Sequence, residues 1–185
     1  SSKSYNDPSN VVLADFSVPE EFINAGHNVR VTAALEESAE KPATGVAAGL
    51  FTGCVEGITP AEGLWTKMEK RFDPSLDLSA NQALGVWVKG DGNGQLLNLR
   101  VESPKHISHG ARGDHFIRID FTGWKYFELV EIESSEFSNY IWPDSGFYVY
   151  DSYRHTVQFN NIDKLQLWYN NLPAGRESGC LISNI

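Results

Sequence analysis

The chain has 185 residues, which is enough for one hydrophobic core and short for two independent domains. Its 15 Lys and Arg residues against 24 Asp and Glu residues give a formal net charge of −9, which repels a phosphate backbone or an anionic lipid surface. We therefore expect neither a nucleic acid nor a membrane as a partner. The sequence has no apolar run of about 18 residues and no basic-then-apolar leader, so it predicts neither a transmembrane helix nor a signal peptide.

Short stretches of alternating apolar and polar residues follow one another along the chain. Residues 1–8 are small and polar and are expected to form a linker or terminal tail, followed by a single β-sandwich domain over residues 9–185. The best helix candidate, residues 58–72, is interrupted by Gly63 and ended by the Asp73-Pro74 pair. The alternation predicts strands at residues 10–17, 27–35, 45–56, 82–89, 95–102, 115–121, 124–132, 146–150, 156–159, 163–170 and 178–185. This succession predicts an all-β fold of two antiparallel sheets with at most one short helix.

The clearest turn lies at residues 91–94 (DGNG), where Gly and Asn supply the positive φ angles of a tight turn. It predicts a hairpin between residues 83–90 and 95–102. These two strands and two later ones, within residues 114–121 and 164–170, each have one apolar face and one face of polar and Trp residues. If the four strands lie side by side, the outer face of their sheet carries Trp87, Lys89, Asn98, Arg100, Arg118, Asp120, Gln166, Trp168 and Asn170.

This combination of side chains suits a carbohydrate. The apolar C–H face of a pyranose loses water favourably against a flat aromatic ring, while its hydroxyls need charged or amide partners. We therefore predict that the nine residues bind a glycan, and that Lys89, Arg100 and Arg118 weakly favour an anionic one. The alternative is a solvated sheet on which Arg100, Glu102, Arg118 and Asp120 only form cross-strand ion pairs, with Trp87 and Trp168 covered by loops.

Two long loops are expected beside this face, at residues 106–115 and 138–155. Loops on a rigid scaffold often hold binding residues, so four of their side chains are added as ligand candidates. The three His residues of the first loop follow no zinc-ligand spacing, which favours a hydrogen-bonding loop over a metal site. The added candidates are Arg112, His115, Trp142 and Tyr150. Separately, Cys54 and Cys180 both lie in predicted strands, and form either one disulfide or two buried thiols.

Four segments together resemble galactose-binding-like β-sandwich modules, especially the family 11 carbohydrate-binding modules and the related complex I intermediate-associated protein family. The segments are Asp15-Phe16 and residues 76–101 (LDLSANQALGVWVKGDGNGQLLNLRV), 117–129 (IRIDFTGWKYFEL) and 165–185 (LQLWYNNLPAGRESGCLISNI). The resemblance implies a jelly roll that binds a polysaccharide or oligosaccharide, secreted or at the cell surface, beside a covalently linked catalytic domain.

The same resemblance implies that a calcium ion ties the first strand to the last. The closing strand has Ser183 where these families usually carry an acid, which leaves Asp15 as a weak candidate ligand. We therefore expect that the domain requires no cofactor.

The leading prediction is a non-catalytic module that targets an attached or partner glycan-degrading enzyme to a polysaccharide. The sequence has no nucleophile elbow, no phosphate-cradling Gly loop and no helix with two His residues. Two alternatives stay open. One is a jelly-roll polysaccharide lyase or glycosidase, since such enzymes also line a sheet with Arg, His, Tyr and acids. The other is a protein-interaction or assembly module with its contacts in the loop at residues 138–155.

Overall fold

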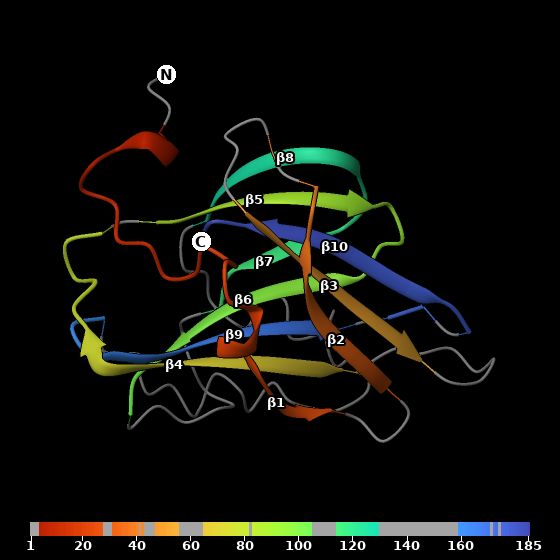
Figure 1. The fold of residues 1–185 in the computed structure, drawn as a ribbon, viewed down its shortest axis with the longest axis horizontal. Coiled ribbons are helices and arrows are strands. Elements are labelled where there is room, and N and C mark those ends of the chain that lie inside the picture. The colour runs from red at the N-terminus through yellow and green to blue at the C-terminus, as the bar shows by residue number, and fades with distance from the viewer. Residues whose placement is uncertain are drawn as a thin grey trace, which may run out of the picture.

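A computed structural model describes residues 4–27, 31–40, 42, 47–55, 65–81, 83–104, 114–129, 159–170, 172–173 and 175–185. In these residues ten strands form two antiparallel five-stranded sheets, which face each other across a common core (Figure 1). The strand order is β1-β4-β9-β6-β7 in sheet A and β2-β3-β10-β5-β8 in sheet B. The predicted two-sheet antiparallel β-sandwich is confirmed.

The strands of each sheet come from distant parts of the chain. Sheet A contains β1 (Ile23–His27), β4 (Thr66–Leu76), β9 (Ile162–Asn170), β6 (Leu96–Glu102) and β7 (Phe116–Arg118). Sheet B contains β2 (Val31–Ser38), β3 (Ala48–Val55), β10 (Glu177–Ser183), β5 (Leu84–Asp91) and β8 (Thr122–Leu129). Two short 3-10 turns, η1 (Ser4–Asn6) and η2 (Pro19–Glu21), are the helical elements of this part of the chain. None of the described helices is long and apolar enough to cross a membrane.

Tyr169 on β9 shows how the two sheets are joined through the core. The side chain is fully buried, and its ring stacks on Phe51 of β3 with 4.1 Å between the ring centroids. Its hydroxyl donates a 2.9 Å hydrogen bond to the Phe51 carbonyl and lies 2.8 Å from the Cys180 sulfur on β10. A buried tyrosine thus contributes apolar area while its polar end keeps hydrogen-bonding partners.

The helix predicted over residues 58–72 is wrong for residues 66–72, which belong to strand β4; residues 58–64 lie outside the described residues. The physical reason is Lys70. Its backbone pairs with Leu165, so it occupies an inward-facing position where the strand pattern requires an apolar residue. The Lys70 ammonium donates a 2.9 Å hydrogen bond to the Leu13 carbonyl and pairs with Glu21 at 2.8 Å. A charged residue at an inward position interrupts the alternation of apolar and polar residues, so the strand cannot be recognised from the sequence.

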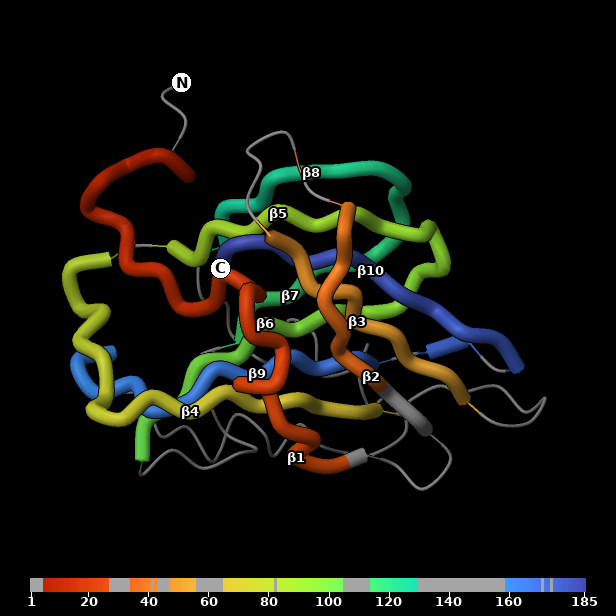
Figure 2. Tube along the Cα trace, viewed as in Figure 1, coloured from red at the N-terminus to blue at the C-terminus, as the bar shows by residue number. Residues whose placement is uncertain are grey.

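The strand predicted over residues 10–17 also does not form. Instead, this segment is attached to the C-terminal end of the chain, beside which it runs in Figure 2. The amides of Leu13 and Ala14 donate to the Ile185 carbonyl at 2.7 and 3.1 Å, and the Ile185 amide donates to the Ala14 carbonyl at 2.9 Å. Phe16 then takes a φ of 58°, which a strand does not allow.

Most other predicted strands are confirmed within a few residues. The segments predicted at 45–56, 82–89, 95–102, 115–121, 124–132, 163–170 and 178–185 correspond to β3, β5, β6, β7, β8, β9 and β10. The segment at residues 27–35 corresponds to β2, whereas β1 was not predicted. Residues 146–150 and 156–158 lie outside the described residues.

Cys54 and Cys180 are both free thiols, so the disulfide alternative is wrong. In the pairing of β3 with β10, Cys180 lies opposite Phe51 and faces the core, whereas Cys54 lies opposite Glu177. Cys54 is three positions from Phe51 on β3, and an odd separation puts it on the other side of the sheet. Only Cys180 is fully buried, and this burial raises its pKa to about 12.

Candidate functional site

The outer face of sheet A brings together six of the nine residues predicted for the binding face. The strand register places Asn98 opposite Trp168 and Arg100 opposite Gln166. These side chains alternate with the core residues of β6 and β9, so they all point away from the core. The six residues are Asn98, Arg100, Arg118, Gln166, Trp168 and Asn170. Asp120 follows β7 as an exposed residue.

Trp87 and Lys89 do not belong to this face. They lie on β5, which pairs with β8 and β10 in sheet B, so their side chains are on the opposite outside of the sandwich. The predicted hairpin is therefore wrong, because the turn at residues 91–94 carries the chain from sheet B to sheet A. Asp91 holds this corner by accepting hydrogen bonds from the Asn93 amide at 3.1 Å and the Gly179 amide at 2.7 Å. The same Gly and Asn residues serve a hairpin or a corner equally well.

Arg100 is the centre of an ionic network on the outer face of sheet A. Its Nε donates to Glu102 at 3.0 Å and its Nη1 donates to Asp114 at 2.9 Å. Asp114 also accepts a 2.8 Å hydrogen bond from the Asn98 side-chain amide. Arg100 is 2% exposed, Glu102 5% and Asp114 1%. Because buried charges are tolerated only when paired, the guanidinium is committed to these two carboxylates.

A second chain of hydrogen bonds holds the indole of Trp168. Its Nε1 donates to the Gln166 side-chain oxygen at 2.8 Å, and the Gln166 amide donates to Glu69 on β4 at 2.7 Å. The other oxygen of Glu69 accepts a 3.1 Å bond from Arg71. Gln166 and Glu69 are buried, whereas Trp168 is half-buried. The ring orientation of Trp168 is therefore set by groups that are themselves fixed.

Trp65 and Lys67 complete what we call the Trp65–Trp168 platform, defined as Trp65, Lys67 and Trp168. The two indole rings lie 5.3 Å apart with an interplanar angle of 38°. The Lys67 ammonium lies 4.8 Å from the centroid of the Trp168 ring and 5.9 Å from that of Trp65. All three side chains are half-buried. Sequence reasoning missed Trp65 and Lys67 because it assigned them to a helix; their alternation with Thr66 and Met68 was the signal.

The chain was compared with known protein families. A family model described as "Carbohydrate binding domain (family 11)" matches residues 8–174. The chain belongs to the family 11 carbohydrate-binding domains. This membership confirms the predicted resemblance and makes the chain a carbohydrate-binding module by family.

Two solved structures of family 11 modules from Clostridium thermocellum share the fold of this family 11 domain. One, from the cellulosomal cellulase Lic26A-Cel5E, aligns with a TM-score of 0.62 at 12% identity, covering 94% of this chain and 91% of that chain. The other, in complex with a β-1,3-1,4-mixed-linked tetrasaccharide, aligns with a TM-score of 0.58 at 13% identity, with the same coverage. A mannan endo-1,4-β-mannosidase from Bifidobacterium adolescentis is 27% identical over 46% of this chain. The matched part covers only 8% of the length of that enzyme.

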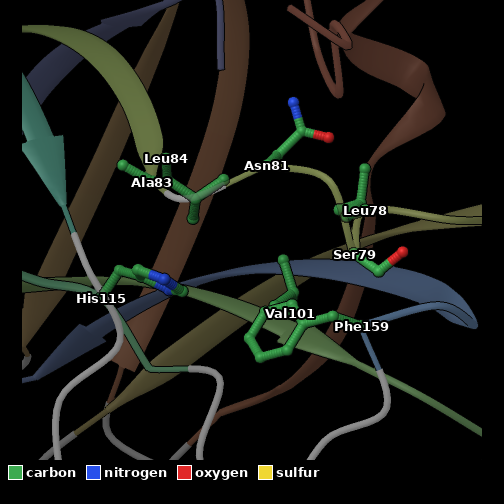
Figure 3. A pocket seen from close by; sticks show the side chains of 8 residues that line it. All are labelled: Leu78, Ser79, Asn81, Ala83, Leu84, Val101, His115 and Phe159. Atoms are coloured by element: carbon green, nitrogen blue, oxygen red, sulfur yellow. The ribbon is translucent and has the colours of Figure 1, made fainter.

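His115 of the family 11 domain lies on the inner side of sheet A. Its ring lines a cavity of 320 Å³ at one end of the sandwich, together with the apolar side chains of Leu78, Leu84, Val101 and Phe159 (Figure 3). The His115 Nδ1 lies 3.0 Å from the Leu99 carbonyl. His115 is therefore separated from the outer face by the sheet itself. The other loop candidates, Arg112, Trp142 and Tyr150, lie outside the described residues, as does most of each predicted loop.

The residues of this domain do not fit the calcium ion that the resemblance implies. The Asp15 carboxylate accepts hydrogen bonds from the hydroxyl and the amide of Ser17 at 2.7 and 3.0 Å, and these bonds lower its pKa. The Ser183 hydroxyl donates to the Ala47 carbonyl at 2.8 Å. Close by in the chain, the Leu13 carbonyl already accepts from the Lys70 ammonium. Within the described ranges, no three His, Cys, Asp or Glu residues lie close enough to hold a metal ion.

Proposed function

We propose that this family 11 domain binds a neutral glycan chain on the outer face of sheet A, with the Trp65–Trp168 platform as its stacking surface. The observation that carries the proposal is the Trp168 indole, which is half-buried and held by Gln166 at 2.8 Å. A ring fixed in advance loses little conformational entropy when a sugar stacks on it. The Lys67 ammonium beside the rings supplies donors for sugar hydroxyls.

A neutral ligand is favoured over the anionic one expected from the sequence. That expectation depended on three cations, of which Lys89 lies on sheet B in an ion pair with Glu40. Arg100 is buried and already paired with two carboxylates, Glu102 and Asp114, which disfavours a third carboxylate from a ligand. Only Arg118 of the three is an exposed cation on this face. The β-1,3-1,4-mixed-linked tetrasaccharide bound by the complexed relative and the mannan in the name of the mannosidase suggest polymers of these types as the first ligands to test.

The domain acts, in this proposal, as an accessory module outside the cell. It carries no catalytic activity of its own and brings an attached or partner glycan-degrading enzyme to its polysaccharide. The support is its family, together with its similarity to the family 11 module of a cellulase and to part of a mannosidase. Binding on a shallow, partly hydrated surface is expected to be weak for each site.

Affinity electrophoresis and titration calorimetry with soluble mixed-linkage β-glucan and galactomannan test the binding face. Trp168→Ala is expected to weaken binding at least about tenfold, since a Trp in an interface commonly contributes this much. Trp124→Ala is the matched control, because it removes the same side chain from β8 of the opposite sheet. Equal affinity in wild type and Trp168→Ala would overturn the choice of face.

Salt dependence and product analysis test the ligand class and the lack of catalysis. Binding of a neutral glycan should change little between about 50 and about 500 mM NaCl, whereas binding of polygalacturonate through ion pairs would weaken steeply. No reducing ends and no unsaturated uronates should appear during prolonged incubation with either polymer. Their release by the purified chain would establish the lyase or glycosidase alternative.

A further inference from the structure

Three aromatic rings from three parts of the chain meet on the outer face of sheet B. Trp87 on β5 lies directly opposite Tyr126 on β8, with 5.3 Å between the ring centroids. Tyr5 of η1 lies over both rings, 5.3 Å from Trp87 and 5.1 Å from Tyr126, and edge-on to each at 66° and 67°. All three side chains are half-buried. We call this group the Tyr5–Trp87–Tyr126 cluster.

Gly85 leaves the room that Tyr126 occupies. A Cβ at position 85 would lie 2.2 Å from the Tyr126 hydroxyl oxygen, so no other residue fits there without moving the phenol. Tyr126 therefore reaches across β5 beside Trp87, and the two rings form one aromatic floor on the sheet. The two rings are tilted by 49° to each other. Each presents a flat aromatic face on the exterior of the sheet, which is the kind of surface that stacks the apolar face of a sugar ring.

Tyr5 is joined to the body of the sandwich by an exposed segment. Residues 6–12 are all exposed, and Leu13 and Ala14 bond to the Ile185 carbonyl. The Tyr5 ring therefore covers Trp87 and Tyr126 while belonging to the same chain. Because Tyr5 covers both rings edge-on, its departure would uncover ring faces on which a sugar ring can stack.

The Trp87 indole N–H is left unsatisfied while Tyr5 is in place. The nitrogen is shielded from water and has no hydrogen-bond partner in the described structure. A buried donor without an acceptor destabilises the arrangement that contains it, so Tyr5 is an imperfect occupant. A sugar offers several hydroxyl oxygens around its ring that can accept from this N–H. The Lys89–Glu40 ion pair, one position further along β5 on the same face, offers partners to its other hydroxyls.

We propose that Trp87 and Tyr126 form a second carbohydrate-binding surface, which Tyr5 occupies in cis and which opens to a glycan when Tyr5 moves away. The inference rests on the proposed glycan-binding function and adds a site on the opposite side of the sandwich. A domain with both surfaces open can hold two glycan chains, one on each sheet.

Indole N–H signals in ¹H–¹⁵N spectra test the two surfaces separately. The chain has five Trp residues, and Trp87→Phe and Trp168→Phe identify the two relevant signals. The probes are the β-1,3-1,4-mixed-linked glucotetraose and mannotetraose, each added to saturation. The Trp168 signal should move in wild type and in Tyr5→Ala. The apparent dissociation constant read from the Trp87 signal should be about tenfold lower in Tyr5→Ala than in wild type, if Tyr5 covers the surface about nine-tenths of the time.

Matched variants separate ring occupancy from other effects. Tyr5→Phe keeps the ring and should behave as wild type, and deletion of residues 1–9 should behave as Tyr5→Ala. Adding Tyr126→Ala to Tyr5→Ala should abolish the response of Trp87 and leave that of Trp168. An unmoved Trp87 signal in both Tyr5→Ala and the deletion overturns the second surface, even when Trp168 responds. An unmoved Trp168 signal with both probes instead counts against the proposed function.

Discussion

The indole N–H of Trp168 and the side-chain oxygen of Gln166, two residues apart on β9, are joined by a 2.8 Å hydrogen bond. Gln166 is buried and donates in turn to Glu69, so the half-buried Trp168 ring rests on a fixed polar support. Such preorganisation moves the entropic cost of orienting a side chain from the binding step to folding. The platform and its support should therefore respond differently to substitution.

Gln166→Leu tests the support without removing the platform. The substitution leaves the Trp168 N–H and one Glu69 oxygen without their present partners, so the free energy of unfolding should fall by about 1–3 kcal/mol. Glycan affinity should fall about three- to tenfold because Trp168 is less well oriented. Calorimetric titration and urea denaturation measure the two effects. Lys164→Gln on the same strand, which loses only a 3.8 Å ion pair, should change either by much less. Full glycan affinity in Gln166→Leu would show that the hydrogen bond does not orient the ring for binding.

Arg100→Met tests the buried ionic network. It leaves Glu102 and Asp114 buried without their guanidinium partner, and the expected loss is about 3–5 kcal/mol in the free energy of unfolding. Adding Asp114→Asn should restore part of this loss, since one uncompensated charge is then removed. Arg118→Met is the control, because Arg118 is an exposed Arg on the same face. Similar stability of Arg100→Met and Arg118→Met in urea denaturation would contradict the pairing.

Lys70→Met tests how the N-terminal segment is attached. The ammonium bonds to the Leu13 carbonyl at 2.9 Å and to Glu21 at 2.8 Å, and its loss should lower the free energy of unfolding by about 1–3 kcal/mol. Lys125→Met, an exposed Lys, should change it by less than about 0.5 kcal/mol.

The same experiment in EDTA and in millimolar calcium tests the metal. Because a lysine already supplies a positive charge at the Leu13 carbonyl, the melting temperature of wild type should be equal in both conditions. A rise of several degrees with calcium would show that the ion binds despite Lys70.

The two cysteines should differ in reactivity. Cys54 is half-buried on the outer side of sheet B, whereas Cys180 is fully buried and its pKa is raised to about 12 by burial. Ellman's reagent at about pH 8 should label one thiol quickly in the native protein and both in urea, since the thiolate is the reactive form. Cys54→Ser should abolish the fast phase. Fast labelling of Cys180 in that variant would contradict its burial.

Cys180 also makes stability depend on alkaline pH. Its pKa rises from 9.0 in the unfolded chain to about 12 in the fold, so above pH 9 the unfolded state loses a proton that the folded state keeps. The free energy of unfolding should therefore fall as pH rises above 9, by at most about 1.4 kcal/mol per pH unit from this group. Urea denaturation at about pH 8 and pH 10 measures this fall, which should be smaller in Cys180→Ala. An equal fall in both proteins would show that Cys180 does not contribute.

Much of the candidate site could be predicted because a period of two separates inward from outward side chains. Asn98, Arg100, Gln166 and Trp168 alternate with core residues along β6 and β9, and all four lie on the same outer face. The β-sandwich followed from the same alternation. What the alternation leaves open is which partners an outward residue has. Glu102, two residues from Arg100, could be named as an ion-pair partner from the sequence, and it does pair with Arg100. Nothing near Arg100 in the sequence shows that Asp114 would also pair with it, because that depends on how β6 and the residues before β7 approach each other.

Trp87 and Trp168 mark the boundary between what the sequence by itself determined and what only the tertiary structure decided. The sequence determined that both point away from the core. Only the assembled sheets decided that they lie on opposite outsides, because the two sheets share one core and their outward faces have the same pattern. Lys70 shows the same for β4. Its charge can face inward only because the fold places the Leu13 carbonyl and Glu21, which are distant in the sequence, beside its ammonium.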